Sequence, residues 1–524
     1  MFGDGVNIAS RLQDLAEPDT ICISDVVYRD VAKKLTLGTV VSLGRPKLKN
    51  IAERFPVYAL LHEKPQGFRQ TVRVQCLKLK QWRRPLQVGA AVLVLAWAGG
   101  VTIRSFYLAS PKEQPQTGTP TDSTSLPLPN KPSIVVLPFV NMSNDPEQEY
   151  FSDGITEDLT SDLSRISSLF VISRNTAFTY KGKAVKLSEV SRELGIRYVV
   201  EGSVRKAGEQ VRITTQLIDA TTDSHLWSDR YDRPIKDIFA IQDEIRQKIV
   251  LALKVRLAPE EQARFQTAPT NNLEAYDFYL RGFESLLGGI YKNEVSTQTR
   301  QMFEKAIELD PQYATAYAML GDTYLLEWFF QWRQPQVQSL ERAFALAQRA
   351  VALDDTLPLP HAILGLVYVW KKQHEQGLVE AKRAVTLDPN FAVGYAQLGN
   401  VLAFVGQPEE GVKALEQAMR LNPRYPDLDL FTLAFAYRVA GRYEEALALG
   451  KKFQARQPDY GPTHFHLAVC YAELDRLEEA RAEGAEILRL NPNFSVERFK
   501  NFWPMKDTAV MESTLAALRK AGLK

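Results

Sequence analysis

A six-residue phrase recurs through the second half of the chain, and its spacing constrains the fold more than any other feature. Five copies, among them AIELDP, AVTLDP and AMRLNP, close at Pro311, Asp355, Pro389, Pro423 and Pro492, and a weaker copy closes at Pro458. From Asp355 onward the closing positions are 34, 34, 35 and 34 residues apart. This period is the length of one helix–turn–helix unit, and such units stack into a superhelix with a concave binding face. The sequence therefore predicts five or six helical pairs over 270–492.

The bulk composition narrows the classes of protein and of site. A chain of 524 residues is too long for a single core and is expected to form several domains. A net charge of +2 argues against a nucleic-acid binder. Cys22, Cys76 and Cys470 form no CxxC pair, which excludes a disulfide framework and a thiolate zinc site. Because His464 and His466 are two positions apart on a predicted helix, they face different ways and form no ligand pair.

An apolar stretch interrupts the first part of the chain. Residues 88–103 include no charged or amide side chain, and the stretch covers 86–108, or 23 residues, if its polar ends reach the headgroups. Six basic residues precede it between Arg69 and Arg84, whereas only Arg104 and Lys112 follow closely. This asymmetry predicts a single-pass inner-membrane protein with a cytoplasmic amino end and its later domains outside the cytoplasm. A buried core helix, or a segment that only dips into the membrane, is the alternative.

Segments of distinct composition separate the expected domains. Residues 64–85 form a basic juxtamembrane segment, and residues 109–132 form a linker rich in Pro, Ser and Thr without apolar periodicity. The expected fold class is multidomain, α/β plus all-α. Its parts are an amino-terminal remnant over 1–63, one transmembrane helix over 86–108, an α/β domain over 133–258, an α-solenoid over 270–492 and a capping helix over 493–524.

The amino-terminal segment contains one helix with a distinctive polar face. In the opening GDGVNIASRL, Asn7 and Arg11 are four positions apart and share a face of a short helix. Taken alone, this pair would be interpreted as a capped, solvated helix face. Strands are expected at 20–24 and 55–61, with a helix around 25–35.

Over residues 2–62 the segment resembles the carboxy-terminal part of a class III adenylate/guanylate cyclase domain. The matching stretches are GDGVNIASRL, CISDVVYRDV, LGRPKLKN and VYALL. The resemblance implies that Asn7 orients the ribose and that the Arg11 guanidinium stabilises charge on phosphorus in the transition state. It also implies an active site at a homodimer interface that uses two Mg²⁺ or Mn²⁺ ions.

The metal-binding aspartates of that family would lie upstream of Met1. Without two metal ions, nothing activates the ribose 3′-hydroxyl or neutralises the triphosphate. We therefore expect no cofactor in this chain and no cyclisation of ATP or GTP by it alone. The preference of the family activity for ATP or GTP stays open.

The middle of the chain alternates strand and helix patterns. The expected elements are a buried strand within 131–143, a helix at 153–164, a strand at 169–174, a helix at 187–194, strands at 198–205, 211–219 and 224–232, and a helix at 236–257. This order predicts one α/β domain. Through VVLPFVNMS, YFSDGITEDL, VISRNTAF, YVVEGSVRK and HLWSDRYDR it resembles the TolB-like amino-terminal domain of bacterial signalling proteins, a family that implies no agreed chemistry.

No catalytic constellation is evident in the middle domain. Asp153, Glu157 and Asp158 are expected in the first turns of a helix, where carboxylates interact favourably with the helix dipole. Trp227 is expected to be a packing residue.

The helical pairs resemble tetratricopeptide (TPR) repeats, and the resemblance implies protein partners. In the unit that ends at Pro423 the family's packing positions hold Tyr395, Leu398, Gly399, Leu402, Gly411, Leu415 and Ala418. The second unit also carries an aromatic cluster of Trp328, Phe329, Phe330 and Trp332. This cluster is interpreted either as a local plug over the superhelix or as a partner-binding knob.

Together these features predict a membrane signalling protein of the adenylate/guanylate cyclase family with a TPR protein-binding module. The alternative is a pure TPR interaction scaffold whose cyclase end is vestigial.

Overall fold

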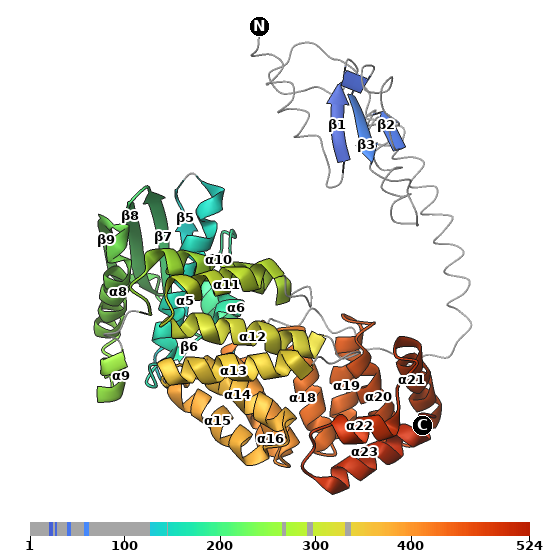
Figure 1. Cartoon of the computed structure of the whole chain (residues 1–524). Helices are drawn as coiled ribbons and strands as arrows, with labels where there is room; N and C mark the ends of the chain where they lie inside the picture. The colour runs from blue at the N-terminus through green and yellow to red at the C-terminus, as the bar shows by residue number, and fades with distance from the viewer. Residues whose placement is uncertain are drawn as a thin grey trace, which may run out of the picture. The chain divides into compact units, whose positions relative to one another are not determined.

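The computed structural model describes residues 20–24, 27–28, 39–42, 57–61, 126–143, 145–264, 269–290, 297–330 and 337–524. They belong to two compact units, Met1–Thr119 and Pro120–Lys524, which are considered separately (Figure 1). Asn7, Arg11, the basic segment 64–85 and the apolar stretch 86–108 lie outside the described residues.

The first unit contains a small antiparallel sheet in the order β1-β3-β2. Its strands are β1 Thr20–Ser24, β2 Thr39–Ser42 and β3 Val57–Leu61. The predicted strands at 20–24 and 55–61 are confirmed as β1 and β3, and they pair with Ser24 opposite the fully buried Val57. The short strand β2 was not anticipated, because its four residues are too few to show alternation.

The second unit begins with a six-stranded mixed sheet in the order β6-β4-β7-β8-β9, with β5 pairing to β7. Its strands are β4 Ser133–Val136, β5 Val140–Asn141, β6 Phe170–Val171, β7 Tyr198–Ala207, β8 Gln210–Asp219 and β9 Ser224–Pro234. β4 runs parallel to β6 and β7, whereas β7, β8 and β9 form antiparallel ladders. The three long strands match the predicted ones within two residues at each end.

Helices connect these strands and cover the sheet. They are η1 Pro146–Gln148, α5 Glu149–Ser164, α6 Arg174–Phe178, α7 Leu187–Leu194, η2 Ile235–Asp237, α8 Ile238–Ala252 and α9 Pro259–Arg264. Side chains alternate between the two faces of β7. Val200 and Val204 join the core that includes α5 and α8, whereas Val199 joins a second core with Leu194 of α7.

Six helical pairs follow in the described part of the chain (Figure 1). The first helix of each pair is called the A helix: α10 Leu273–Ile290, α12 Ala314–Phe330, α14 Pro358–Trp370, α16 Ala392–Phe404, α18 Asp427–Val439 and α20 Gly461–Glu473. The second, the B helix, is α11 Thr297–Leu309, α13 Val337–Leu353, α15 His374–Leu387, α17 Pro408–Leu421, α19 Tyr443–Gln454 and α21 Leu477–Leu490. The predicted array of five or six pairs is confirmed.

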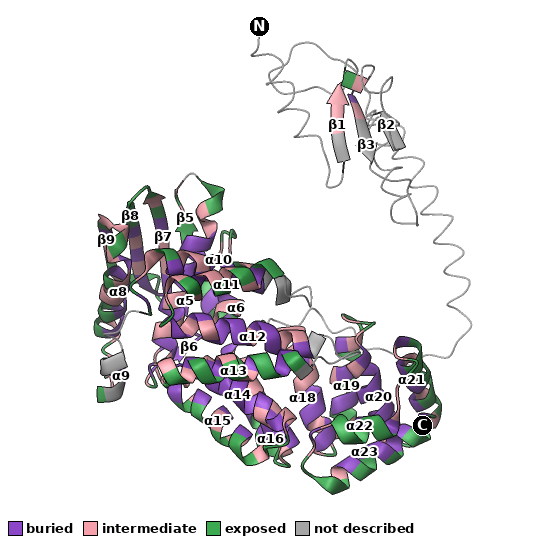
Figure 2. Ribbon diagram, in the orientation of Figure 1, coloured by how far each residue is buried: buried purple, intermediate pink, exposed green. Residues whose placement is uncertain are grey.

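Successive A helices contact one another more extensively than successive B helices do among the described residues. The A helices therefore line the inner, concave side of the array. Buried residues follow the packed faces of the pairs, and exposed residues follow their outer faces (Figure 2).

Glycines allow the two helices of a pair to approach closely. A Cβ added at Gly399 would lie 2.8 Å from the carbonyl oxygen of Gly411, and one added at Gly411 would lie 2.8 Å from the carbonyl oxygen of Gly399. Gly365 and Gly377 face each other in the same way in the preceding pair. Helix backbones this close leave no room for a side chain between them.

Two short helices close the chain. α22 Val496–Phe502 is followed by an extended segment and by α23 Thr508–Lys520, which packs against α20 and α21. Asp507 caps α23 by accepting hydrogen bonds from the backbone N–H groups of Ala509 and Val510.

The expected transmembrane helix and inner-membrane location are corrected by the structure. Across the described ranges, no helix is both long enough and apolar enough to cross a membrane. A span needs about 20 mostly apolar residues. The longest described helix, α10, has 18 residues and includes the charged residues Glu274, Asp277, Arg281 and Glu284, because it packs as a repeat helix with one polar face.

The close approach at Gly399 gives a stability prediction. In Gly399→Ala, the new methyl would lie 2.5 Å from Leu415 Cγ, so we expect a loss of about 1–3 kcal/mol in the free energy of unfolding. Gly321→Ala, at the same position of the second pair, is the matched control. Its nearest neighbour would be 3.4 Å away, so helix propensity should make it neutral or stabilising by about 0.5–1 kcal/mol. Chemical denaturation followed by circular dichroism measures both, and equal effects would contradict the packing argument.

Candidate protein-binding site

Polar side chains in the turns between helical pairs attach the repeats to the α/β domain. In the turn after α15, Asp388 accepts a hydrogen bond from the Ser164 hydroxyl at 2.5 Å. The Asn390 amide donates to the Ser164 carbonyl oxygen at 2.7 Å, and its carbonyl oxygen accepts from the Val171 N–H at 3.2 Å. Asp388 and Asn390 are both buried, so these bonds form out of water, where a lost partner is costly.

The next turn repeats this attachment one unit further along. Asn422, at the position that corresponds to Asp388, accepts a hydrogen bond from the Thr176 hydroxyl at 2.7 Å. The Leu421 carbonyl oxygen accepts from the Ser173 N–H at 2.8 Å. Two successive repeats therefore hold the start of α6 and the end of β6.

Two arginines strengthen the same junction. Arg420 donates to the backbone carbonyl oxygens of Leu194 and Gly195, at 3.0 and 3.1 Å, and its guanidinium lies over the Phe170 ring. Arg424 donates to the Glu193 carboxylate at 3.0 Å and lies over the Tyr180 ring. These contacts hold the α/β domain against the amino-terminal ends of the A helices.

Burial at this junction changes the acidity of its carboxyl groups. Desolvation raises the pKa of Asp388 to about 6, although the hydrogen bond from Ser164 opposes the shift. Desolvation likewise raises the pKa of Asp158 to about 7 in α5, where Asp158 accepts hydrogen bonds from Tyr276 of α10 and from Gln242 of α8. Both carboxyls contribute to joining helices, so their charge state affects how the α/β domain is held.

The three acids considered as catalytic candidates have structural roles. Asp153 binds the Lys181 ammonium at 2.6 Å, Glu157 pairs with Arg174 at 3.1 Å, and Asp158 joins α5 to α8 and α10. The expectation that they serve the helix dipole is wrong, because α5 begins at Glu149 and they lie beyond its first turn.

Part of the concave side of the array is open to solvent. We call this part the open stripe. We define the open stripe as Val393, Gln397 and Asn400 of α16 with Leu428 and Thr432 of α18, all exposed or half-buried. On α16 the spacing of four and three residues places these side chains on one face, in line with Phe404. Amide, hydroxyl and aliphatic groups in one concave row suit a protein ligand better than a small charged molecule.

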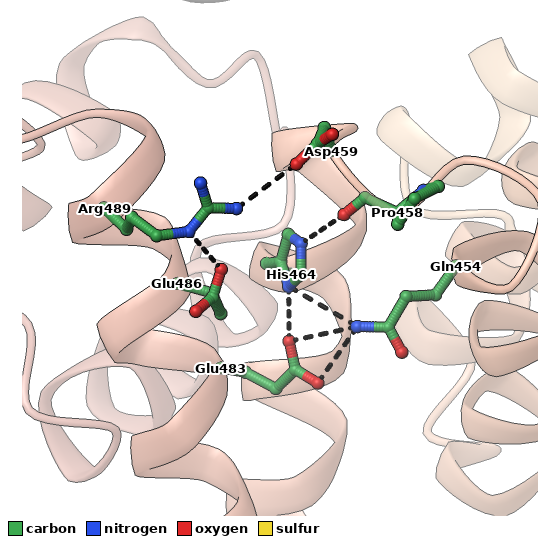
Figure 3. Close-up of polar contacts among 7 residues, drawn as sticks. All are labelled: Gln454, Pro458, Asp459, His464, Glu483, Glu486 and Arg489. Atoms are coloured by element: carbon green, nitrogen blue, oxygen red, sulfur yellow. Dashed lines mark hydrogen bonds and ion pairs between the residues drawn. The ribbon is translucent and has the colours of Figure 1, made fainter. Parts of the chain in front are cut away.

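Two histidines of the repeats each join a carboxylate of the B helix to a backbone carbonyl oxygen before the A helix. His464 of α20 contacts the Glu483 carboxylate at 2.6 Å through Nδ1 and the Pro458 carbonyl oxygen at 2.9 Å through Nε2, and Gln454 also donates to Glu483 (Figure 3). Because both ring partners are acceptors, the protonated ring satisfies both. The hydrogen bond to Glu483 raises the pKa of His464.

His361 makes the same contacts in an earlier repeat, to Glu380 at 2.6 Å and to the Asp355 carbonyl oxygen at 3.0 Å. The sequence spacings are also the same, 19 and 6 residues. These histidines belong to repeat packing and not to a ligand set. In the described ranges, no group of three or more His, Cys, Asp or Glu side chains could hold a metal ion.

A cavity of about 600 Å³ in the α/β domain is lined by β7, β8, the stretch from β4 to β5 and the loop after α6. Its polar lining includes Glu201, Ser203, Thr214 and Gln216 on the strands, and Lys183 on the loop after α6. The volume lies in the range of small-molecule sites. This lining combines hydroxyl, amide and single charged groups without a nucleophile beside a base, so it offers no recognisable reaction centre.

Comparison with known sequences supports the TPR interpretation. The tetratricopeptide repeat family matches residues 392–425 and 438–501. The chain therefore contains TPR repeats, a protein-interaction module.

One curated relative is a "Putative adenylate cyclase 3" from Rhizobium meliloti (strain 1021), 38% identical over 376 residues. The match covers 72% of this chain and 55% of the relative, so the chain spans little more than half of that protein's length. This similarity supports a link to cyclases. The TolB-like relationship of the α/β domain stays a prediction, as do the domain boundaries and the roles of Asn7 and Arg11.

Solved structures with some similarity include YrrB, described as a TPR protein with an unusual peptide-binding site, at 24% identity over 36% of this chain and 93% of YrrB, with a TM-score of 0.27. TTC0263, a thermophilic TPR protein of Thermus thermophilus, is 22% identical over 37% of this chain and 98% of its own, with a TM-score of 0.30. At TM-scores this low, neither similarity bears on the function of this chain.

The raised pKa of Asp388 predicts a pH dependence of stability. Between about pH 4 and 6 the folded protein holds a proton on Asp388 that the unfolded chain releases, so the free energy of unfolding falls as pH rises through this range. Asp388→Asn keeps an acceptor for Ser164 but cannot ionise. We expect the free energy of unfolding of this variant, relative to that of wild type, to increase by up to about 3 kcal/mol as pH rises from 4 to 7. Denaturant titration at each pH measures both proteins. Parallel pH profiles for the two proteins would contradict this account.

Proposed function

We propose that this chain is the protein-binding part of a cyclase-type signalling system. Its TPR array recruits a protein partner along the open stripe, while the α/β domain stabilises the array from one side. The observation that carries this proposal is the open row of side chains on A helices that are held in place by buried contacts in the turns before them.

The link to cyclases rests on the resemblance over residues 2–62 and on the curated relative. By that resemblance Asn7 would contact the ribose and Arg11 the phosphates of ATP or GTP. Two Mg²⁺ or Mn²⁺ ions would supply the activation of the ribose hydroxyl. The described residues do not fit such ions, since they gather no set of ligands. By the same resemblance, we propose that the groups binding these ions act at a homodimer interface.

A pure interaction scaffold is the second candidate. The contacts that join the repeats to the α/β domain favour it, because they build a rigid docking body that needs no nucleotide chemistry. The two candidates differ only in whether Asn7 and Arg11 take part in a reaction.

An activity measurement tests the cyclase proposal. We expect the purified chain, incubated with ATP or GTP and Mn²⁺, to form no cyclic nucleotide above a protein-free blank, because the described residues bring together no group of acids that could hold two metal ions. Chromatography of the products with mass detection gives the answer. Turnover that disappears in Arg11→Ala would show instead that the chain is itself a cyclase.

Site-specific crosslinking tests the proposed binding face. A photo-reactive phenylalanine analogue replaces either Val393 of α16, on the open stripe, or Val379 of α15, on a B helix; both side chains are exposed. In the source cells we expect a discrete adduct from position 393 and none from position 379, read on a denaturing gel. Equal adducts from both positions would mean that the A helices are not the preferred face.

A further inference from the structure

A segment near the end of the chain, made of the last turn of α22 and the extended residues that follow it, lies across the A helices. We call residues 499–507 (FKNFWPMKD) the strap. It runs from the last turn of α22 to the start of α23 and reaches from the last repeat back to α12, where Phe502 contacts Trp328. The strap thus covers the array along the ends of its A helices, next to the open stripe.

Two adjacent aromatic residues of the strap fit between aromatic side chains of successive A helices. Trp503 contacts Trp370 at 5.6 Å, Phe404 at 5.4 Å, Phe435 at 6.0 Å and Phe465 at 5.8 Å between ring centroids. Phe502 contacts Trp328 at 5.6 Å and Trp370 at 5.1 Å. We call Trp328, Trp370, Phe404, Phe435 and Phe465 the aromatic row. One A helix after another contributes to it, so the row extends along the array.

Backbone contacts hold the strap in the manner of a bound peptide. Lys372 donates to the Asn501 carbonyl oxygen at 2.9 Å, and His374 contacts the Pro504 carbonyl oxygen at 2.7 Å. The Lys506 N–H donates to the carbonyl oxygen of Phe404 at 3.0 Å. Pro504 has no N–H group and therefore leaves no donor unsatisfied in the extended segment.

A charge pair completes the contact. The Lys506 ammonium lies 2.6 Å from the Glu375 carboxylate at the start of α15, and both side chains are substantially exposed. A segment that fits this surface therefore carries neighbouring aromatic residues, then proline, then a cation.

The strap is attached less completely than the helical pairs are. Phe502 is 39% exposed. Within the described structure, the indole N–H groups of Trp370 and Trp503 are buried without a hydrogen-bond partner. The strap belongs to no helix pair, and α23 is anchored to α20 and α21 by its own contacts. Removing the strap would therefore uncover the aromatic row without dismantling a repeat.

We propose that the aromatic row is a docking groove for a partner segment with two adjacent aromatic residues followed by proline and lysine, and that the strap is its displaceable intramolecular occupant. This proposal rests on the proposed protein-binding function and specifies the chemistry of the partner. Binding of such a segment competes with the strap and releases it.

Peptide binding to the full chain tests the proposal. The probe is a fluorescent peptide with the sequence of residues 497–509, and its affinity is measured by anisotropy. We expect Phe502→Ala/Trp503→Ala to bind the probe at least about tenfold more tightly than wild type, because the groove is no longer filled. Adding Trp370→Ala should abolish that binding. Trp227→Ala, which removes an indole from β9 away from the strap, is the matched control and should behave as wild type.

A milder variant covers the case in which the double variant loses its fold. Lys506→Glu places a carboxylate opposite Glu375 on the surface, which leaves the aromatic core intact, and should tighten probe binding severalfold. Circular dichroism checks that each variant is folded. Unchanged probe affinity in folded release variants would overturn the proposal, as would a wild-type dimer that exchanges straps between copies. Since adducts from position 393 do not depend on the strap, the protein-binding function would survive that failure.

Discussion

Buried carboxylate and amide side chains in the turns between repeats hold the α/β domain, and the rest of the arrangement depends on them. Asp388, Asn390 and Asn422 satisfy backbone and hydroxyl groups of α5, β6 and α6 that are shielded from water. Left without a partner, each of these buried groups would lower the free energy of unfolding by about 1–3 kcal/mol. The polar groups of the α/β domain and of the repeats therefore pair specifically with one another. A solenoid that is usually open on both edges thus has one edge occupied by its own neighbouring domain.

The concave side is consequently divided along each A helix. On α16, Ala392 at the beginning packs toward the α/β domain, while Phe404 at the end lies under Trp503. Val393, Gln397 and Asn400 remain accessible between these two contacts. The surface available to a partner is therefore bounded and presents polar and aliphatic groups. Such boundaries favour selective over non-specific binding.

Local pattern and period account for what the sequence predicted. The 34-residue step required stacked pairs, and alternation placed β7, β8 and β9, because both signals lie within short windows. The same signals could not separate a turn residue from a docking residue. Asp388 belongs to the recurring six-residue phrase whether or not it contacts another domain. Only the fold brings Ser164, 224 residues away, into contact with it.

The strap was not predicted, for the same reason. Trp503 contacts Trp370, which is distant in the sequence, and no periodic pattern indicates that contact. Trp328, buried against Trp370 and Phe502, favours the plug interpretation of its aromatic cluster. Asn7 and Arg11 lie outside the described residues, so their roles rest on resemblance.

Contacts across distant repeats also change how the array should melt. An ordinary solenoid behaves as a row of neighbours, in which unfolding starts at either end and spreads unit by unit. Here residues 499–507 join the last pair to the second, and the α/β domain bonds to the two turns on either side of the fourth pair. Fraying of any one unit breaks long-range bonds as well as neighbouring ones, which couples the pairs into a single cooperative transition.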